Sequence, residues 1–283
     1  MEHFLNKIHC GDCLKVLEKI PPELVDITVT SPPYNIKNSS GNGLKNGNGG
    51  KWPHAELING YDNHDDCMPR ADYILWQRQC ITAILRVLKP DGALFYNHKP
   101  RVQRGLLENP QDIFGNENFP LRQIIIWRRK GGINFNPGYF LPTYECIYLI
   151  AKPKFKLLPK ANALGDVWDI SQIGEKNSHP APFPLALAQR CIGATSAQVV
   201  LDPFMGSGTT ALAALGLERN YIGIEKSPEY CRMARQKIKN QQPTLAAELT
   251  QLEKQIAKEQ AAKYRRLNKR RGKQNMKVYE GRP

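Results

Sequence analysis

The residues of this chain that could do chemistry fall in two short motifs that lie far apart in the sequence. The first is Ser31-Pro32-Pro33-Tyr34, and the second runs from Asp202 to Thr210 as Asp-Pro-Phe-Met-Gly-Ser-Gly-Thr-Thr. Apolar, β-branched runs precede both motifs, so each is expected where a buried parallel strand ends and a loop begins. Ligands bind at that edge of open α/β sheets. The two motifs therefore predict one site, in which a planar group is held against a bound cofactor.

The second motif has the composition of a turn that binds a ligand through its backbone. Gly206 and Gly208 have no Cβ to keep a ligand away, and the helix expected next would present its N-terminus. A phosphate loop would need a lysine here, and a dinucleotide fingerprint would need a third glycine. Glu225 ends the next expected strand, about 20 residues on, where a carboxylate can accept both hydroxyls of a ribose. This combination favours a nucleoside ligand over the alternative that Glu225 is a solvated charge.

The first motif is a turn that offers mainly hydrogen-bond acceptors. Its two prolines fix φ and remove two donors, so the carbonyls and the Ser31 hydroxyl are expected to point outward. Such a frame suits an exocyclic amine, which donates two hydrogens. Tyr34 would add a face on which a base can stack, worth about 1–3 kcal/mol. That gain would help to offset the cost of taking the base out of a duplex. In isolation, the tetrapeptide would be interpreted more simply as a proline-rich turn with a packing tyrosine.

The segment around the first expected strand, 8–10, holds further polar candidates. The carboxylate of Asp12 could contact the same ligand or cap the helix expected from Leu14, and the sequence leaves both open. His9, Cys10 and Cys13 look like a fragment of a metal site, but a second ligand pair with suitable spacing is missing, so no metal is expected.

Composition points to one large α/β domain with a polyanionic partner. The chain has 283 residues, 41% of them hydrophobic, and a formal net charge of +14. From residue 254 on, eleven Lys/Arg stand against two Glu, and such a tail favours nucleic acid over a ligand-free, solvated face. Seven cysteines without regular spacing, and no signal peptide, predict a reducing cytoplasm, and no apolar run is long enough to span a membrane.

Hydrophobic periodicity and turn residues predict alternating strands and helices. Strands are expected at 8–10, 25–30, 93–96, 123–127, 145–151, 199–201 and 221–224, and helices at 14–20, 73–88, 182–195, 211–217, 228–240 and 244–271. The Asn/Gly-rich stretch 36–63 is either a mobile lid over the site or a plain surface loop. Residues 152–178 are expected to be irregular.

With these residues in hand, the chain resembles the DNA amino-methyltransferases, which transfer a methyl group from S-adenosylmethionine to the exocyclic amine of cytosine or adenine. Ser31-Pro32-Pro33-Tyr34 matches their catalytic motif, and the segment from Asp202 to Thr210 is similar to their cofactor loop. The catalytic motif comes first, as in the circularly permuted beta group. Gly11-Asp12 resembles that group's segment contacting the cofactor adenine, and 179–184 resembles the segment that precedes the helix beside the methionine moiety. The resemblance covers residues 5–240.

The resemblance implies an S-adenosylmethionine-dependent methyltransferase (Rossmann-like) fold with a mostly parallel, seven-stranded sheet. It implies a catalytic domain at 1–243, a short target-recognition region at 153–178 and a basic helical tail at 244–283. Double-stranded DNA would be the partner, with base flipping, in a prokaryotic cytosol or nucleoid. A cognate restriction endonuclease and the oligomeric state stay open. The cofactor would contact the following residues: Asp12, His179, Phe183, Asp202, Phe204, Gly206, Ser207, Gly208, Thr209 and Glu225.

The target base depends largely on Ser31. In the family resembled, the Ser-Pro-Pro-Tyr form leans towards cytosine N4 and the Asp-Pro-Pro-Tyr form towards adenine N6. A serine hydroxyl is a neutral acceptor that can also donate, whereas a carboxylate only accepts. We therefore expect a cytosine-N4 enzyme, with an adenine-N6 enzyme as the alternative. Less favoured are an RNA methyltransferase and a DNA-binding protein without catalysis. Arg128, Arg129 and Lys130 could contact DNA near the flipped nucleotide, or be solvated charges at a strand end.

Overall fold

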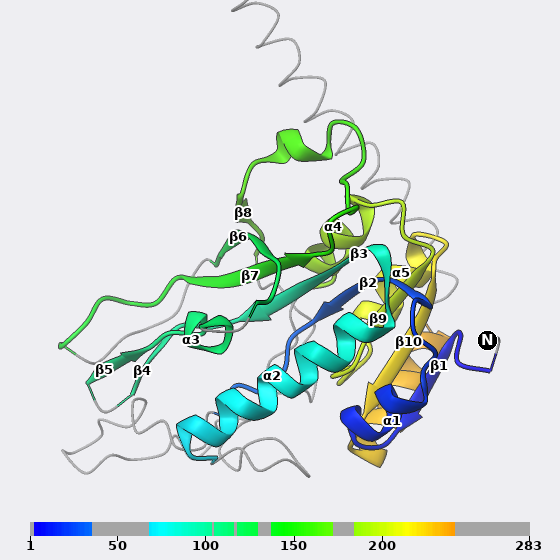
Figure 1. Ribbon diagram of the computed structural model, residues 1–283, viewed down its shortest axis with the longest axis horizontal. Helices are drawn as coiled ribbons and strands as arrows, with labels where there is room; N and C mark the ends of the chain where they lie inside the picture. Colours follow the sequence, from blue (N-terminus) through cyan, green and yellow to red (C-terminus); the bar gives the residue numbers. More distant parts are fainter. Residues whose placement is uncertain are drawn as a thin grey trace, which may run out of the picture.

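The fold is built on one sheet of eight strands with helices on both faces (Figure 1). The computed structural model describes residues 3–35, 68–103, 105–115, 118–129, 137–171 and 184–240. The strands of the sheet are β1 (Lys7–Cys10), β2 (Val25–Thr30), β3 (Leu88–His98), β6 (Leu121–Arg128), β7 (Tyr144–Ala151), β8 (Val167–Asp169), β9 (Val199–Asp202) and β10 (Asn220–Glu225). A separate hairpin pairs β4 (Arg101–Gln103) with β5 (Leu106–Glu108). The helices are α1 (Cys13–Lys19), α2 (Arg70–Val87), α3 (Gln111–Phe114), α4 (Leu185–Gly193), α5 (Thr209–Gly216) and one over 228–240.

The sheet is mostly parallel, and its order places the two motifs next to each other. The strand order is β1-β10-β9-β2-β3-β7-β6-β8, in which only the pairs made by β7 are antiparallel. From β9 the chain crosses through α5 to β10 on one side, and from β2 it crosses through α2 to β3 on the other. The order therefore reverses between β9 and β2, and such a switch point opens a crevice at the carboxyl ends of the strands.

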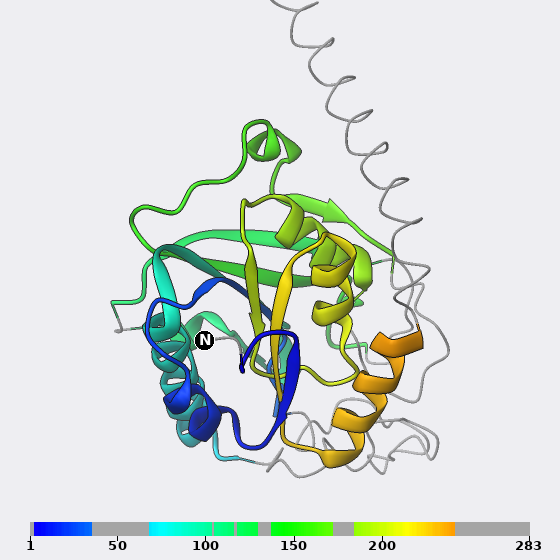
Figure 2. The same ribbon diagram turned by 90° about the vertical axis from the view of Figure 1, so that its right-hand side faces the viewer.

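Two apolar cores lie on opposite faces of the sheet. Alternate residues of β3 face opposite ways, so that Ala93 and Phe95 join one core while Leu94 and Tyr96 join the other. The first core contains residues of α4, α5 and the helix over 228–240, and the second contains residues of α1, α2 and α3. Figure 2 shows these two helical layers on either side of the sheet. The central strands are buried on both faces, which explains their continuous apolar runs.

The turn expected at Lys89–Gly92 lies inside β3 as a bulge. Leu88 pairs with Val25 and Ala93 with Ile27, so four residues of β3 lie opposite Asp26 alone. Asp26 uses its carboxylate to hold the irregularity, with Oδ1 2.6 Å from the Lys89 ammonium and Oδ2 2.7 Å from the backbone N of Val199. The bulge thus ties together the start of three neighbouring strands.

The expected strands and helices are confirmed within a few residues over the described ranges, with two differences. The sheet has eight strands where seven were expected, because residues 152–178, expected to be irregular, contain a short helical turn (Ala161–Leu164) and strand β8, which pairs with β6. The hairpin β4–β5 and helix α3 had no sequence signal. The expected loop at 36–63 and tail at 244–283 lie outside the described residues. No helix among those residues is long and apolar enough to cross a membrane.

Replacing Gly92 with alanine tests the bulge. A Cβ there would lie 2.8 Å from the carbonyl oxygen of Asp26 and 3.0 Å from that of Lys89, and backbone atoms cannot easily move away. Gly92→Ala should lower the free energy of unfolding by about 1–3 kcal/mol in urea titrations. The matched control is Gly193→Ala, where the nearest atom to the new Cβ is 4.0 Å away, and it should leave stability unchanged or slightly raised. Equal effects of both changes would contradict the close contact.

Candidate active site

The predicted site residues that the structure describes come together at the carboxyl edge of the parallel strands. Asp12 follows β1, Glu225 ends β10, Asp202 ends β9 and Ser31 follows β2. His98 ends β3 at the same edge. The proline turn after β2 and the glycine loop after β9 therefore flank the switch point of the sheet, as their positions after β-branched runs predicted.

The carboxylate of Asp202 joins the two motifs across the switch point. It is 1% exposed, and its Oδ1 accepts hydrogen bonds from Thr30 Oγ1 at 2.6 Å and from the backbone N of Phe204 at 3.0 Å. Its Oδ2 accepts one from Thr210 Oγ1 at 2.6 Å. Thr30 is the residue before Ser31, and Thr210 lies in the first turn of α5. The carboxylate of Asp202 thus links the turn after β2 to the loop after β9 through hydrogen bonds. Its predicted contact with a cofactor stays a prediction.

Burial dominates the electrostatics of Asp202. Removal from water raises the pKa of its carboxyl to about 6, although the hydrogen bonds from Thr210, Thr30 and Phe204 act in the opposite direction. A buried charge is tolerated here because three donors surround it.

The loop after Asp202 adopts the turn that its glycines predicted. Gly206 and Gly208 have φ values of 51° and 90°, which side chains with a Cβ rarely adopt. The backbone N of Met205 donates to the carbonyl of Ile224 at 2.9 Å, which anchors the loop to β10. A Cβ on Gly208 would come within 3.1 Å of the Cβ of Ala234, so the turn also lets the helix over 228–240 pack closely. Ser207 and Thr209 complete the loop and are nearly buried.

Glu225 lies beside this loop and shapes it. Its Oε2 accepts from the backbone N of Gly206 and its Oε1 from the backbone N of Ser227, both at 2.8 Å. Burial raises the pKa of Glu225, while these amide donors lower it. Each carboxylate oxygen has two lone pairs, so both can still accept a hydrogen from a ligand hydroxyl. A turn with an acceptor pair at its side is a fitting cradle for the ribose of a nucleoside.

Two further candidates for the cofactor have contacts within the protein. Asp12 caps α1, since its Oδ1 accepts from the backbone N of Leu14 at 3.1 Å and of Lys15 at 3.3 Å, which confirms the cap weighed for it. The half-buried Phe204 ring meets Trp76 edge-on, with centroids 5.7 Å apart. His179 and Phe183 lie outside the described residues, so their predicted roles stay predictions.

Side chains of α2 form hydrogen bonds with the proline turn, and they correct the expected direction of one carbonyl. The carbonyl of Pro33 was expected to point outward, but it accepts hydrogen bonds from Tyr73 Oη at 2.8 Å and from Gln77 Nε2 at 3.2 Å. Because buried donors on α2 need partners, they draw this carbonyl inward. Among the described residues, none donates to the carbonyl of Pro32. The acceptors left for a ligand are therefore Pro32 and Ser31.

Tyr34 packs against His98 and makes polar contacts through its hydroxyl. The two rings stack at a centroid distance of 4.6 Å. The Tyr34 hydroxyl lies 2.7 Å from Ser31 Oγ, 2.8 Å from Asn97 Nδ2 and 3.2 Å from Glu145 Oε2. Burial lowers the pKa of His98 to about 3, so this ring is neutral near pH 7. One face of Tyr34 is thus supported by a neutral ring, as a platform for a stacked base requires.

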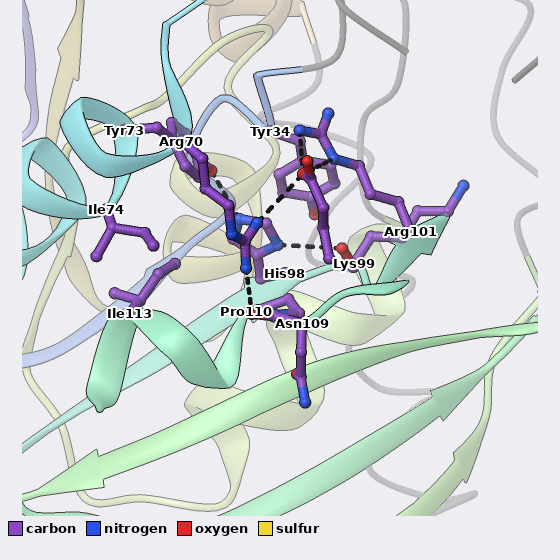
Figure 3. A pocket seen from close by; sticks show the side chains of 11 residues that line it. Tyr34, Arg70, Tyr73, Ile74, His98, Lys99, Arg101, Asn109, Pro110 and Ile113 are labelled. Carbon is purple, nitrogen blue, oxygen red and sulfur yellow. Dashed lines mark hydrogen bonds and ion pairs between the residues drawn. The ribbon is translucent and has the colours of Figure 1, made fainter. Parts of the chain in front are cut away.

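A small cavity adjoins this pair of rings (Figure 3). Tyr34, Tyr73 and His98 line it together with Lys99, Arg70 and Arg101, and its volume is about 10 Å³. That is enough for about one water molecule. Glu108 bonds to Arg101 at 2.6 Å and pairs with Arg70 at 3.3 Å, which leaves the lining with more cations than acids.

Sequence reasoning missed Asn97, His98 and Glu145. The pair Asn97-His98 follows a buried apolar run, so its place at a strand end was a usable signal. Glu145 had none, because it lies near the start of β7, ahead of an apolar run, and looks like an ordinary strand-end charge. Of the three side chains that could contact DNA or be solvated charges, Arg128 pairs with Asp169 and Arg129 with Glu145, while Lys130 lies outside the described residues.

Comparison with known proteins gives consistent matches. The model of the DNA methylase family matches residues 25–236. Type II methyltransferase M.BglII of Bacillus subtilis is 30% identical over 274 residues, which cover 82% of this chain and 68% of that protein. Type II methyltransferase M.SmaI of Serratia marcescens is 30% identical over 287 residues, covering 82% and 90%.

Solved structures share the fold. The Thermus thermophilus protein TTHA0409, solved in complex with S-adenosyl-L-methionine, is 27% identical with a TM-score of 0.58, covering 84% of this chain and 96% of that chain. The PvuII DNA methyltransferase (cytosine-N4-specific) has a TM-score of 0.63 at 20% identity, covering 81% and 84%, and supports the fold alone.

Substitutions at Asp202 test the hydrogen-bonded link between the two motifs and the ionisation of its carboxylate. Asp202→Ala leaves three buried donors without an acceptor and should lower the free energy of unfolding by about 2–4 kcal/mol. Asp202→Asn keeps the acceptor for Thr30 and Phe204 and should cost less. Because the folded pKa of about 6 lies above the ordinary 3.8, the protonated form stabilises the wild type below pH 4. That stability, about 3 kcal/mol, is lost as pH rises to 6.

Urea titrations at intervals between pH 4 and 7 measure both effects. Asp202→Asn carries no titrating group, so its stability should lack that fall relative to the wild type. The same fall in Asp202→Asn and wild type would show that another group titrates.

Proposed function

Because the chain belongs to the DNA methylase family, we propose that it transfers a methyl group to the exocyclic N4 amine of cytosine in a short double-stranded DNA site. The observation that carries this proposal is the position of Ser31. A neutral hydroxyl follows β2 beside the glycine turn, and Thr30 and Asp202 fasten the two together at 2.6 Å. In the Ser-Pro-Pro-Tyr form of this family, that hydroxyl is associated with cytosine N4.

S-adenosylmethionine is the proposed methyl donor, and the residues present fit it. The relative solved with this molecule supports the assignment. Gly206 and Gly208 provide two positions without a Cβ in the turn, and Glu225 provides two oxygens for ribose hydroxyls. Asp12, His179, Phe183, Asp202, Phe204, Ser207 and Thr209 are the other proposed contacts. When bound, the sulfonium group supplies an electrophilic methyl carbon.

The chain's own contribution is to position the amine. Ser31 Oγ and the Pro32 carbonyl would accept hydrogen bonds from the two N–H groups of the amine. These bonds would direct the nitrogen lone pair at the methyl carbon. Tyr34, supported by His98, would stack on the flipped base. Direct transfer to an activated methyl group needs alignment more than a strong base.

Double-stranded DNA is the proposed partner. Lys99, Arg101 and Arg129 stand at the edge that carries Ser31, where phosphates would approach. We place further DNA contacts in the tail 244–283 and in the short region 153–178. A restriction endonuclease of the same specificity is a proposed functional partner, supported by the type II names of the relatives.

Nucleoside analysis tests the base. DNA from cells that express the chain is digested to nucleosides and analysed by mass spectrometry, and N4-methyldeoxycytidine should appear above the level in cells with an empty vector. Long-read sequencing of the same DNA then gives the modified site. Ser31→Ala should abolish or strongly reduce the signal while the protein stays folded. Finding N6-methyladenine alone would replace cytosine with adenine as the target.

Removal of the Glu225 carboxylate tests the cofactor site. Glu225→Ala should weaken the binding of S-adenosylmethionine in calorimetry by about tenfold or more, since hydrogen bonds to a charged group are worth about 1.5–3 kcal/mol. The control is Glu229→Gln, an exposed acid nearby, which should bind as the wild type does. A wild type that binds no S-adenosylmethionine would favour a DNA-binding protein without catalysis.

A further inference from the structure

Glu145 is a buried acid at the active site to which neither motif assigns a role. It is the second residue of β7, at the edge that carries Ser31, and it is 6% exposed. Its Oε2 contacts Tyr34 and Asn97, and its Oε1 lies 3.3 Å from Arg129 Nη1. A carboxylate held this deeply needs donors, and the identity of those donors fixes the direction of the surrounding hydrogen bonds.

Asn97 sets the first direction. A carboxylate only accepts, so the Asn97 amide must turn its Nδ2 towards Glu145 Oε2, which lies at 2.8 Å. The same Nδ2 lies 2.8 Å from the Tyr34 hydroxyl and donates to it. The Tyr34 oxygen therefore already accepts one hydrogen bond from Asn97.

Tyr34 sets the second direction. Its phenol has one hydrogen, and the acceptors within reach are Glu145 Oε2 at 3.2 Å and Ser31 Oγ at 2.7 Å. A charged carboxylate is the stronger acceptor, so the hydrogen goes to Glu145. Ser31 must then donate its own hydrogen to the Tyr34 oxygen, because two oxygens at 2.7 Å need a hydrogen between them.

We propose that Glu145 is a positioning residue that acts through Tyr34 to turn the hydroxyl hydrogen of Ser31 into the protein. The lone pairs of Ser31 then face outward as acceptors for the target amine. This inference rests on the proposed methyl transfer to an amine, and it adds a reason why a hydroxyl, which can also donate, serves there as an acceptor. Tyr34 thus has two tasks, since its ring stacks and its hydroxyl passes on the polarity of Glu145.

The neighbours of Glu145 keep the chain of hydrogen bonds directed. Arg129, which follows β6, pairs with it. The Lys99 ammonium, beyond the end of β3, is near enough for the charge of Glu145 to act on it. Burial lowers the pKa of Lys99, and the charge of Arg129 lowers it further, while Glu145 raises it. The Glu145 carboxylate therefore has two cationic side chains close to it.

A double-mutant cycle with Tyr34→Phe and Glu145→Gln tests the proposal. The rate constant of methyl transfer is measured in single turnovers, on a duplex that carries the site mapped in the wild type. The glutamine amide can donate to the Tyr34 hydroxyl and so reverse the direction of the hydrogen bonds. Phenylalanine at position 34 removes the hydroxyl that connects Ser31 with Glu145. Each single change should lower the rate constant at least about tenfold. The double variant should be no slower than the slower single variant, because both changes break the same chain.

Companion measurements separate positioning from general damage. The KM for DNA, the Kd for S-adenosylmethionine, the thermal unfolding temperature and the fluorescence of 2-aminopurine at the target position should stay near wild-type values in Glu145→Gln. The matched control is Glu18→Gln, which makes the same change at an exposed acid of α1 and should leave the rate constant unchanged.

The outcomes are distinct. Multiplicative effects in the double variant, or a Glu145→Gln variant as fast as the wild type, would overturn the role of Glu145 and leave the proposed function standing. Loss of folding or cofactor binding in step with the rate would make Glu145 structural. A folded wild type that methylates no DNA would refute the proposed function, and the role of Glu145 with it.

Discussion

The buried carboxylate of Asp202 is the constraint on which the site depends. It spans the switch point between β9 and β2, and its oxygens hold Thr30, Thr210 and the backbone of Phe204. Burying this carboxyl raises its pKa to about 6, and three donors compensate for the lost water. Because packed interiors deform little, the turn that begins at Ser31 and the glycine turn are held at one separation. In-line transfer between two bound groups needs such a fixed separation.

Around Asp202, most hydrogen-bond donors are bonded to groups within the protein, whereas several acceptors are left for a ligand. Tyr73 and Gln77 of α2 hold the Pro33 carbonyl, and backbone amides hold Glu225. Asn97 donates to Glu145 and Tyr34. What is left for a ligand is a row of oxygens and one aromatic face, which suits an amine on a flat base. Membership of the DNA methylase family agrees with this arrangement.

Around the proposed reacting centre, cationic side chains outnumber acidic ones. His98 is neutral at physiological pH because burial lowers its pKa to about 3. Lys99, Arg101 and Arg129 lie around this centre, with Glu108 and Glu145 as the acids at their side. Such an excess of positive charge attracts a polyanion.

The sequence alone determined the two motifs, their place at strand ends and the order of most elements, because these follow from local periodicity, prolines and glycines. It could not determine the eighth strand. Val167–Asp169 is too short to show a hydrophobic period, and it is a strand because it pairs with the distant β6. The sequence left open whether Asp12 caps a helix, and the structure shows that its side chain caps α1. Tertiary structure decided that Pro33 turns inward and that Glu145, over a hundred residues from Tyr34, meets its hydroxyl. Contacts at that separation depend on strand order, and no local pattern encodes it.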